Sequence, residues 1–410
     1  MPDLEPATQP ALAIGQAEPE SQTGQVVTIA LGHASHDTFT SMLAPLLPLF
    51  IANLSLSKTE AGLLTSFLQG PALLQPFIGH LSDRRDLRYA FVLAPTCTAL
   101  AMGLLGLAPS YATLAVLLLL AGVSSAVWHG IGPGLSGRLS ARKRLGRDMA
   151  FWMAGGEIGY SLGPLLVVSV VRWLGLKNTP WMTIIGVMGS LLLFFRLRKI
   201  PKSEGRQENR QVPIWQALVS MRRVMLPVMG LVVLRSFALA ALGSFLPTFL
   251  REEGTGFWLA GAALTIYQGA ATVGVLLGGS LSDRLGRRSI VLVSMLVTPL
   301  LLLVFLGLTG APQLSVLALI GLIVASFDPV IMALVQENYA DSRALAGATY
   351  LSLLFIVRSA AVVIMGAFAD WLGLRWAFTA SAFVFLLGMP IVFMLPSKAN
   401  RRAGSTSRPV

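Results

Sequence analysis

The sequence contains little charge and almost no cysteine. Charged residues make up 12% of the chain and hydrophobic residues 54%, whereas a soluble domain carries about 25% charged residues. Over 410 residues, this deficit argues against a string of soluble domains and for a protein surrounded by lipid. The single cysteine, Cys97, excludes an intrachain disulfide.

The first 25 residues contain no lysine or arginine. A secretory signal needs a basic segment before its apolar core, so this stretch does not fit one. Its content of Pro, Gln, Glu and Ala instead predicts a disordered cytoplasmic tail over residues 1–25.

Enzymatic motifs are also lacking. The sequence shows no Walker loop and no nucleophile elbow. Its four histidines lack the paired cysteine or carboxylate spacing of a structural metal site. We therefore expect no enzyme activity, no cofactor and no metal, and an ion gradient rather than ATP as the energy source for any transport.

Long apolar segments dominate the rest of the chain. About 20 helical residues cross a bilayer, and twelve segments approach or exceed that length. They lie at 26–52, 59–78, 89–108, 111–135, 149–173, 181–195, 224–250, 258–278, 290–308, 314–335, 345–371 and 376–394. The pattern predicts an all-α membrane protein with a six-helix bundle at 26–196, a charged cytoplasmic linker at 197–223, a second six-helix bundle at 224–396 and a cytoplasmic tail at 397–410.

Basic residues are concentrated in the loops that follow the even-numbered spans, and the formal net charge is +12. Lysine and arginine gather on the cytoplasmic side of membrane proteins, so the even-numbered spans are expected to end in the cytoplasm, with both termini inside. The positive charge is thus explained by topology, and we expect no nucleic-acid partner.

Two similar loops mark an internal repeat. The segment from Gly79 to Arg88 and the segment from Gly279 to Arg288 are offset by 200 residues. Both resemble the pattern Gly-x-Leu-x-Asp-Arg-x-Gly-Arg-Arg of the major facilitator superfamily, although the first copy has Asp86 and Leu87 where Gly and Arg are usual. The resemblance implies about twelve transmembrane helices in two pseudo-symmetric bundles.

Within that superfamily the chain is similar to the fosmidomycin-resistance group of exporters. The similarity rests on Gly32-His33-x-x-His36-Asp37, Ser124-Ser125-x-x-x-His129, Gly155-Gly156-x-x-Gly159-x-Ser161-Leu-Gly163-Pro164 and Gln336-Glu337. The group usually follows the histidine of the second motif with Pro-Glu, whereas Gly130 and Ile131 follow His129 in this chain.

Ionisable residues inside the spans are few and unevenly placed. Apart from residues at the ends of the spans, they are His33, His36, Asp37, His129, Glu157, Arg235, Asp328 and Arg358. The third, sixth, ninth and twelfth spans have none, and the resemblance implies that these four are the outer helices. Because a charge at the bilayer centre costs at least ~2.5–3.5 kcal/mol, the others are expected to line a polar path.

One group of these residues is suited to carrying protons. His33, His36 and Asp37 are spaced to share one face of a helix, and imidazoles change charge between about pH 5 and 8. We assign His33, His36, Asp37 and Glu157 to proton coupling. The alternative is that they only form hydrogen bonds to neighbouring helices.

A second group is suited to binding the substrate. Arg235 and Arg358 are the two arginines deep in spans, and a guanidinium matches a carboxylate, phosphate or phosphonate. The repeat offset aligns His129 with Asp328, so we assign Arg235, Arg358, His129 and Asp328 to substrate binding. The open alternative is that each arginine neutralises a nearby carboxylate.

The two repeated loops are expected to control conformational switching. The residues assigned to gating are Gly79, Asp83, Arg84, Gly279, Asp283, Arg284 and Arg288. An aspartate in such a loop can pair with the N-terminus of a neighbouring helix. The alternative is that the loops only anchor the protein by their positive charge.

Together these features predict a monomeric, multi-pass transporter of the bacterial inner membrane, whose partners are protons, lipid and a small-molecule substrate. The favoured function is proton-coupled efflux of a small polar or anionic compound such as a phosphonate. Proton-coupled uptake of a carboxylate or phosphorylated metabolite is the first alternative. A lipid flippase and a non-transporting receptor are less well supported.

Overall fold

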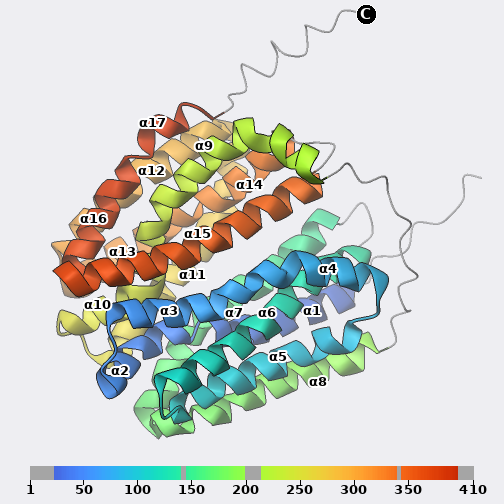
Figure 1. The fold of residues 1–410 in the computed structure, drawn as a ribbon, viewed down its shortest axis with the longest axis horizontal. Coiled ribbons are helices and arrows are strands. Elements are labelled where there is room, and N and C mark those ends of the chain that lie inside the picture. Colours follow the sequence, from blue (N-terminus) through green and yellow to red (C-terminus); the bar gives the residue numbers. More distant parts are fainter. Residues whose placement is uncertain (1–22, 140–144, 199–213, 339–342, 396–410) are drawn as a thin grey trace, which may run out of the picture.

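A computed structural model describes residues 23–139, 145–198, 214–338 and 343–395. Most of the predicted N-terminal tail (residues 1–22), the predicted C-terminal tail (397–410) and the middle of the predicted linker (199–213) lie outside these ranges, whereas residues 23–25 of the predicted N-terminal tail are helical. The described residues form helices and short connections, without a strand among them. Figure 1 shows the helices in two groups, one from each half of the chain.

The first half forms the N-terminal bundle. Its elements are α1 (Thr23–Thr40), α2 (Leu43–Leu54), α3 (Lys58–Gln69), the 3-10 helix η1 (Gly70–Leu74), α4 (Gln75–Arg84), α5 (Arg88–Gly103), η2 (Leu104–Leu107), α6 (Tyr111–Leu139), α7 (Leu145–Leu174), η4 (Leu176–Met182) and α8 (Thr183–Leu197). Proline marks the interruptions, because it cannot donate the hydrogen bond that continues a helix. Between α1 and α2, for example, Pro45 leaves the carbonyl of Ser41 without the donor four residues on.

The second half forms the C-terminal bundle. Its elements are α9 (Ile214–Ala240), a π-helical turn η5 (Ala241–Phe245), α10 (Leu246–Glu252), α11 (Phe257–Leu285), α12 (Arg287–Leu306), α13 (Gly310–Ala325), α14 (Phe327–Asn338), α15 (Arg343–Leu372), α16 (Leu374–Leu386) and α17 (Met389–Val392). Because α9 begins at Ile214, residues 214–223 of the segment taken as linker are helical.

Eleven helical segments among the described residues are long and apolar enough to cross a membrane. The remaining predicted span, 59–78, is not one of these eleven segments. It is formed by α3, η1 and α4 in succession, with the 3-10 turn at Gly70 and Pro71. The chain is therefore a multi-pass membrane protein with the twelve-helix, two-bundle architecture that the repeat predicted.

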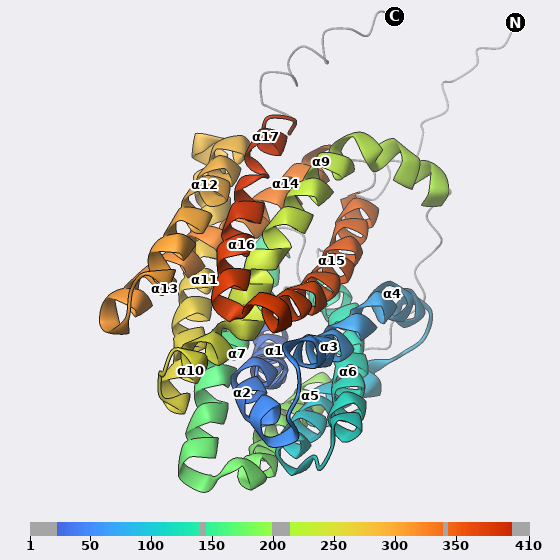
Figure 2. The ribbon, with the colours of Figure 1, turned by 60° about the vertical axis from the view of Figure 1, so that its left-hand side comes forward.

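The two bundles meet along two seams, α3 against α15 and α7 against α11. At the end of the molecule where α3 begins and α15 ends, which we call the sealed end, the ribbons of α3 and α15 lie side by side (Figures 1 and 2). They diverge toward the opposite end, which carries the α4–α5 and α11–α12 connections. We call this the loop end.

Glycine permits the close approach at the sealed end. A Cβ atom on Gly62 of α3 would lie 2.8 Å from the carbonyl oxygen of Val362 on α15. A Cβ atom on Gly366 would meet the backbone of Lys58 and Thr59. The backbones of the two helices can touch because neither glycine has a side chain.

Candidate functional site

Three histidines and one aspartate form a single cluster inside the N-terminal bundle. His33, His36 and Asp37 come from α1, and His129 comes from α6, which packs against α1. His36 is fully buried, His33 is 3% exposed and Asp37 is 9% exposed. Packing of α6 against α1 thus joins two motifs that are about 90 residues apart in the sequence, and it places His129 with the residues assigned to proton coupling rather than beside Asp328.

Asp37 lies at the centre of this cluster. Its Oδ1 accepts a hydrogen bond from Nδ1 of His36 at 2.7 Å, and its Oδ2 lies 3.1 Å from Nε2 of His33. Nε2 of His129 is 3.8 Å from Oδ1. All three imidazoles therefore face one carboxylate, which explains how a charged group is tolerated at this depth.

Aromatic rings fix the orientation of the histidines. His33 stacks on Trp152 of α7, with ring centroids 4.3 Å apart. Trp128 lies between His36 and Phe91, with nearly parallel rings at 5.4 and 4.1 Å. Sequence analysis did not single out Trp152, because nothing in the spacing of the motifs links α7 to His33.

A second charged cluster, built around arginine rather than histidine, lies inside the C-terminal bundle. Arg235 of α9 forms a bidentate pair with Asp328 of α14, in which both N–H···O distances are 2.9 Å. Its Nη2 also donates to the carbonyl oxygen of Val324 at 2.8 Å. Arg235 is only 1% exposed, so this guanidinium is committed to the protein, as the alternative interpretation of the sequence proposed.

Arg358 of α15 is placed differently. Its side chain is 33% exposed, and its Nη2 lies 3.8 Å from Oδ1 of Asp328, beyond hydrogen-bond distance. Its Nε is buried without a hydrogen-bond partner in the described structure. Nε of Arg235 also lacks a partner, but both Nη atoms of Arg235 are hydrogen-bonded, whereas Arg358 forms no hydrogen bond with the described residues.

Glu157 of α7 lies within electrostatic range of both clusters, since Asp37, Asp328 and Arg358 all act on it. It is partly buried and has no hydrogen bond or ion pair to any residue in the described ranges. The hydroxyl of Tyr350 on α15 is likewise buried and unpartnered among the described residues. These two groups were not expected to be unpaired, because sequence spacing does not show which partners are missing.

The two repeated loops are described unequally. In the second copy, Nη2 of Arg287 lies 2.7 Å from Asp283 and 3.0 Å from Glu337 at the end of α14. Arg288 lies over the ring of Phe393, 4.6 Å from its centroid, while Gly279 and Arg284 belong to the end of α11. In the first copy Gly79 lies on α4 near the carbonyl oxygen of Gly130, and the side chains of Asp83 and Arg84 lie outside the described set.

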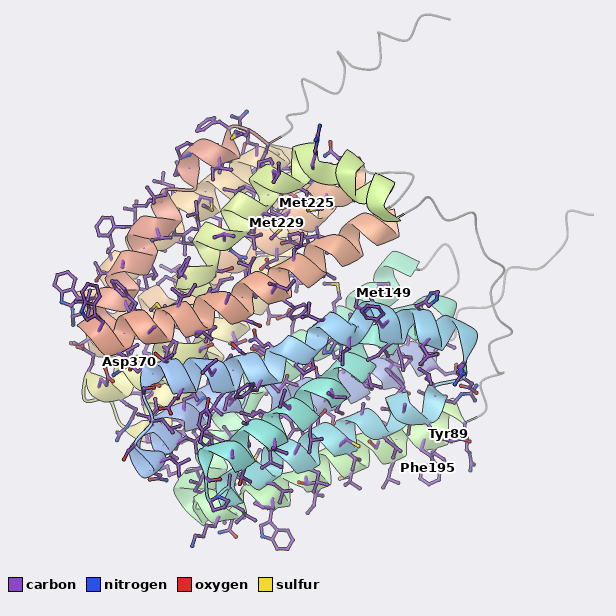
Figure 3. The ribbon with its side chains drawn as sticks, in the orientation of Figure 1. Tyr89, Met149, Phe195, Met225, Met229 and Asp370 are labelled. Carbon is purple, nitrogen blue, oxygen red and sulfur yellow. The ribbon has the colours of Figure 1, made fainter. Side chains whose placement is uncertain are left out.

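Polar contacts between the two bundles cluster toward the sealed end. Asp370 of α15 accepts hydrogen bonds from the backbone of Lys58 and Thr59 at 2.7 and 2.8 Å, and Lys58 pairs with Glu252 at 3.1 Å. Figure 3 labels Asp370 where α15 meets α3. Among the described residues, one hydrogen bond of the α3–α15 seam lies closest to the loop end. It runs from the hydroxyl of Ser66 to the carbonyl oxygen of Ser359.

Comparison with known proteins agrees with this architecture. The family model described as Major Facilitator Superfamily matches residues 29–264 and 259–409. The chain is 26% identical to the fosmidomycin resistance protein of Escherichia coli K12 over 399 residues, which cover 94% of this chain and 97% of that protein. It is also 26% identical to the uncharacterized MFS-type transporter YfnC of Bacillus subtilis, over 92% of this chain and 94% of the other.

Solved structures show the same fold. A bacterial homolog of the human lysosomal transporter Spinster, in an inward-facing and occupied conformation, superimposes with a TM-score of 0.78 at 14% identity, covering 96% of this chain and all of the other. A D-xylose–proton symporter gives a TM-score of 0.66 at 16% identity, with 93% and 99% of the two chains covered. At these identities the likeness concerns the fold alone.

Proposed function

Because the chain belongs to the major facilitator superfamily, we propose that it is a secondary active transporter that exports a small polar or anionic compound in exchange for protons. The observation that carries the proposal is that Glu157 and Arg358, one from each bundle, lie within electrostatic range of each other without forming an ion pair. Glu157 forms no hydrogen bond or ion pair with a described residue, and Arg358 lies 3.8 Å from Asp328 with an unpartnered Nε.

Arg358 is the group we assign to the substrate anion. A guanidinium presents several N–H donors in one plane and suits carboxylate, phosphate and phosphonate oxygens. Asp328 is the carboxylate that lies near Arg358, but its two oxygens are already bonded to Arg235. A substrate anion would thus supply the charge that Arg358 lacks. The relative named for resistance to fosmidomycin supports a phosphonate as the first compound to test.

Glu157 is the group we assign to the proton. A partly buried carboxylate that forms no ion pair is suited to taking up a proton, because an unpaired charge within a membrane protein is costly. Because Glu157 lies near both clusters, we expect binding of an anionic substrate to change the balance between its protonated and charged forms. The wider assignment of His33, His36 and Asp37 to proton coupling stays a prediction.

The direction of access follows from the two ends of the molecule. Basic residues are concentrated in the loops at the loop end, so we assign that end to the cytoplasm and the sealed end to the periplasm, with both termini in the cytoplasm. The structure then corresponds to the state that loads substrate from the cytoplasm of a bacterial inner membrane. The Asp283–Arg287–Glu337 network supports a role for the second repeated loop in switching between states.

Transport in vesicles would test the proposal. Everted membrane vesicles containing the protein should accumulate radiolabelled fosmidomycin when their interior is acidified, and dissipation of the pH gradient should abolish accumulation. Arg358→Lys, which keeps the charge, should retain part of this activity, and Arg358→Gln should lose it. Accumulation in right-side-out vesicles acidified outside would instead establish uptake. No gradient-driven movement of phosphonates in either preparation would refute phosphonate export.

A further inference from the structure

The histidine–aspartate cluster has a second property, which concerns its unshared electron pairs. His33, Asp37 and His129 each present one atom that can bind a metal, and these atoms all lie within 4.8 Å of one another. Spacing in the sequence does not show such a site, because His129 comes from a different helix from the other two. The cluster forms only when α6 packs against α1.

The hydrogen bonds of the two imidazoles determine which nitrogen is free. Nδ1 of His33 lies 2.8 Å from the carbonyl oxygen of Trp152, and Nδ1 of His129 lies 3.0 Å from the carbonyl oxygen of Ser125. A carbonyl oxygen only accepts, so both Nδ1 atoms must carry hydrogen. In the neutral imidazole, each Nε2 then presents a lone pair.

The three ligand atoms lie close together. The two Nε2 atoms are 3.2 Å apart, and Oδ2 of Asp37 is 3.1 Å from Nε2 of His33. Ligand atoms bonded tetrahedrally to Zn²⁺ at about 2.0–2.1 Å stand roughly 3.3 Å from one another, and these two distances match that spacing. The third side is longer, since Nε2 of His129 lies 3.8 Å from Oδ1 of Asp37. Electron-rich atoms this close repel one another unless positive charge lies among them.

A metal ion suits this arrangement better than a single proton does. A proton is shared along a line between two atoms, whereas these three atoms approach from different directions. Each ligand is also held by an outer partner: the carbonyl oxygens of Trp152 and Ser125 hold the histidines, and His36 Nδ1 holds Asp37 at 2.7 Å. Metal-binding histidines characteristically donate their second N–H to such an acceptor.

We infer that His33, His129 and Asp37 form a binding site for one divalent transition-metal ion of the zinc type. Two imidazole nitrogens and one carboxylate oxygen are the donor set that zinc accepts, and three protein ligands leave a coordination position open. The side chains of His129 and Asp37 are 26% and 12% exposed, against 4% for His33. The open position therefore lies on the side of His129. This inference does not depend on the proposed export of an anion.

Binding of Zn²⁺ to the purified full-length protein tests the inference directly. The protein would carry Cys97→Ser and a histidine-free affinity tag, so that no thiol or tag binds metal. After treatment with a chelator, isothermal titration should show one Zn²⁺ per chain, and elemental analysis after gel filtration should recover the same ratio. Co²⁺ bound in its place should give a visible absorption band.

Variants distinguish this site from other histidine sites. His129→Ala should weaken Zn²⁺ binding by about 100-fold or more, whereas His80→Ala, which alters an exposed histidine outside the cluster, should leave it unchanged. Unchanged melting of His129→Ala without metal would show that it folds. Absence of saturable binding, or equal loss in both histidine variants, would overturn the inference and leave protons as the only cation that the cluster holds. Because no pH gradient or drug is involved, this result is independent of the transport assay.

Discussion

The carboxylate of Asp370, near the end of α15, caps the first turn of α3 in the other bundle through Thr59. Oδ2 of Asp370 accepts from both the backbone N–H and the hydroxyl of Thr59, while Oδ1 accepts from the N–H of Lys58. Ser57 and Glu60 form a capping box that satisfies the next free N–H groups. The first turn of α3 is thus fully capped only while the two bundles touch.

We expect Asp370→Asn to shift the protein toward the state open at the sealed end. The amide keeps one acceptor oxygen but loses the second acceptor and the negative charge, so we expect a loss of about 1 kcal/mol, which corresponds to a roughly fivefold change in the ratio of two states. The readout is labelling of Ser66→Cys by a membrane-impermeant maleimide in a Cys97→Ser background, and the rate should rise. The control is Glu253→Gln, which breaks the pair with Arg375 inside the C-terminal bundle. Equal labelling of the Asp370→Asn and Glu253→Gln proteins would mean that the contacts of Asp370 do not hold the sealed end closed.

Arg235 and Arg358, the two arginines deep in the spans of the C-terminal bundle, should have separable effects. Arg235→Met leaves Asp328 without its bidentate partner and should destabilise the protein by roughly 3–5 kcal/mol, seen as a lower melting temperature in detergent. Arg358→Gln should melt near the parent temperature and lose substrate binding. If Arg358→Gln destabilises the protein as much as Arg235→Met, its role is structural.

Replacement of both Arg235 and Asp328 provides a further check on whether the two side chains stabilise the protein through each other. Arg235→Met combined with Asp328→Leu removes both charges together, so the double variant should melt at a higher temperature than Arg235→Met alone. A double variant as unstable as the sum of the two single variants would mean that the two side chains do not depend on each other for stability.

Glu157→Gln should uncouple transport from the pH gradient. The amide cannot exchange a proton, so accumulation against a concentration gradient should cease. Counterflow, in which labelled substrate exchanges for unlabelled substrate across proteoliposomes, needs no net proton movement and should continue. Glu157→Asp keeps the carboxylate and serves as the control. Normal gradient-driven accumulation by Glu157→Gln would assign the proton to another residue.

Gly159→Ala should destabilise the N-terminal bundle. An added Cβ would collide with the carbonyl oxygen of Ala34 on α1, and overpacking of this kind costs about 1–3 kcal/mol. Gly269→Ala on α11 is the matched control, because nothing lies within 4 Å of its added Cβ. Thermal unfolding in detergent should show a lower melting temperature for Gly159→Ala only.

Much of the architecture could be predicted because lipid imposes simple rules. Apolar length marked the spans, and the 200-residue offset of the Asp83 and Asp283 motifs indicated two bundles. Charges inside the spans were identified for the same reason: a charged residue in an apolar segment is costly and therefore conspicuous. The gathering of His129 with His33, His36 and Asp37 was not predicted, because the repeat offset aligned His129 with Asp328.

Pairing could not be predicted in the same way. Nothing in the sequence shows that Asp328 is bonded to Arg235 rather than Arg358, because that choice depends on the position of α14 relative to α9 and α15. Asp370 was overlooked for a related reason: it lies near the end of a predicted span, where a carboxylate costs little, and its partners are backbone N–H groups of α3. Backbone partners carry no signature in the side-chain sequence.

The glycines at positions 155, 159 and 163 have a mechanical consequence. Their missing side chains place the backbone of α7 directly against the carbonyls of Ala30, Ala34 and Thr38 on α1, so the two helices are in direct backbone contact at these three positions. We therefore expect α1 and α7 to move as one rigid body, together with the histidine cluster and Glu157. Any rocking of the protein must then be taken up where α3 meets α15 and α7 meets α11, and the distance from Asp37 to Glu157 should stay constant throughout the transport cycle.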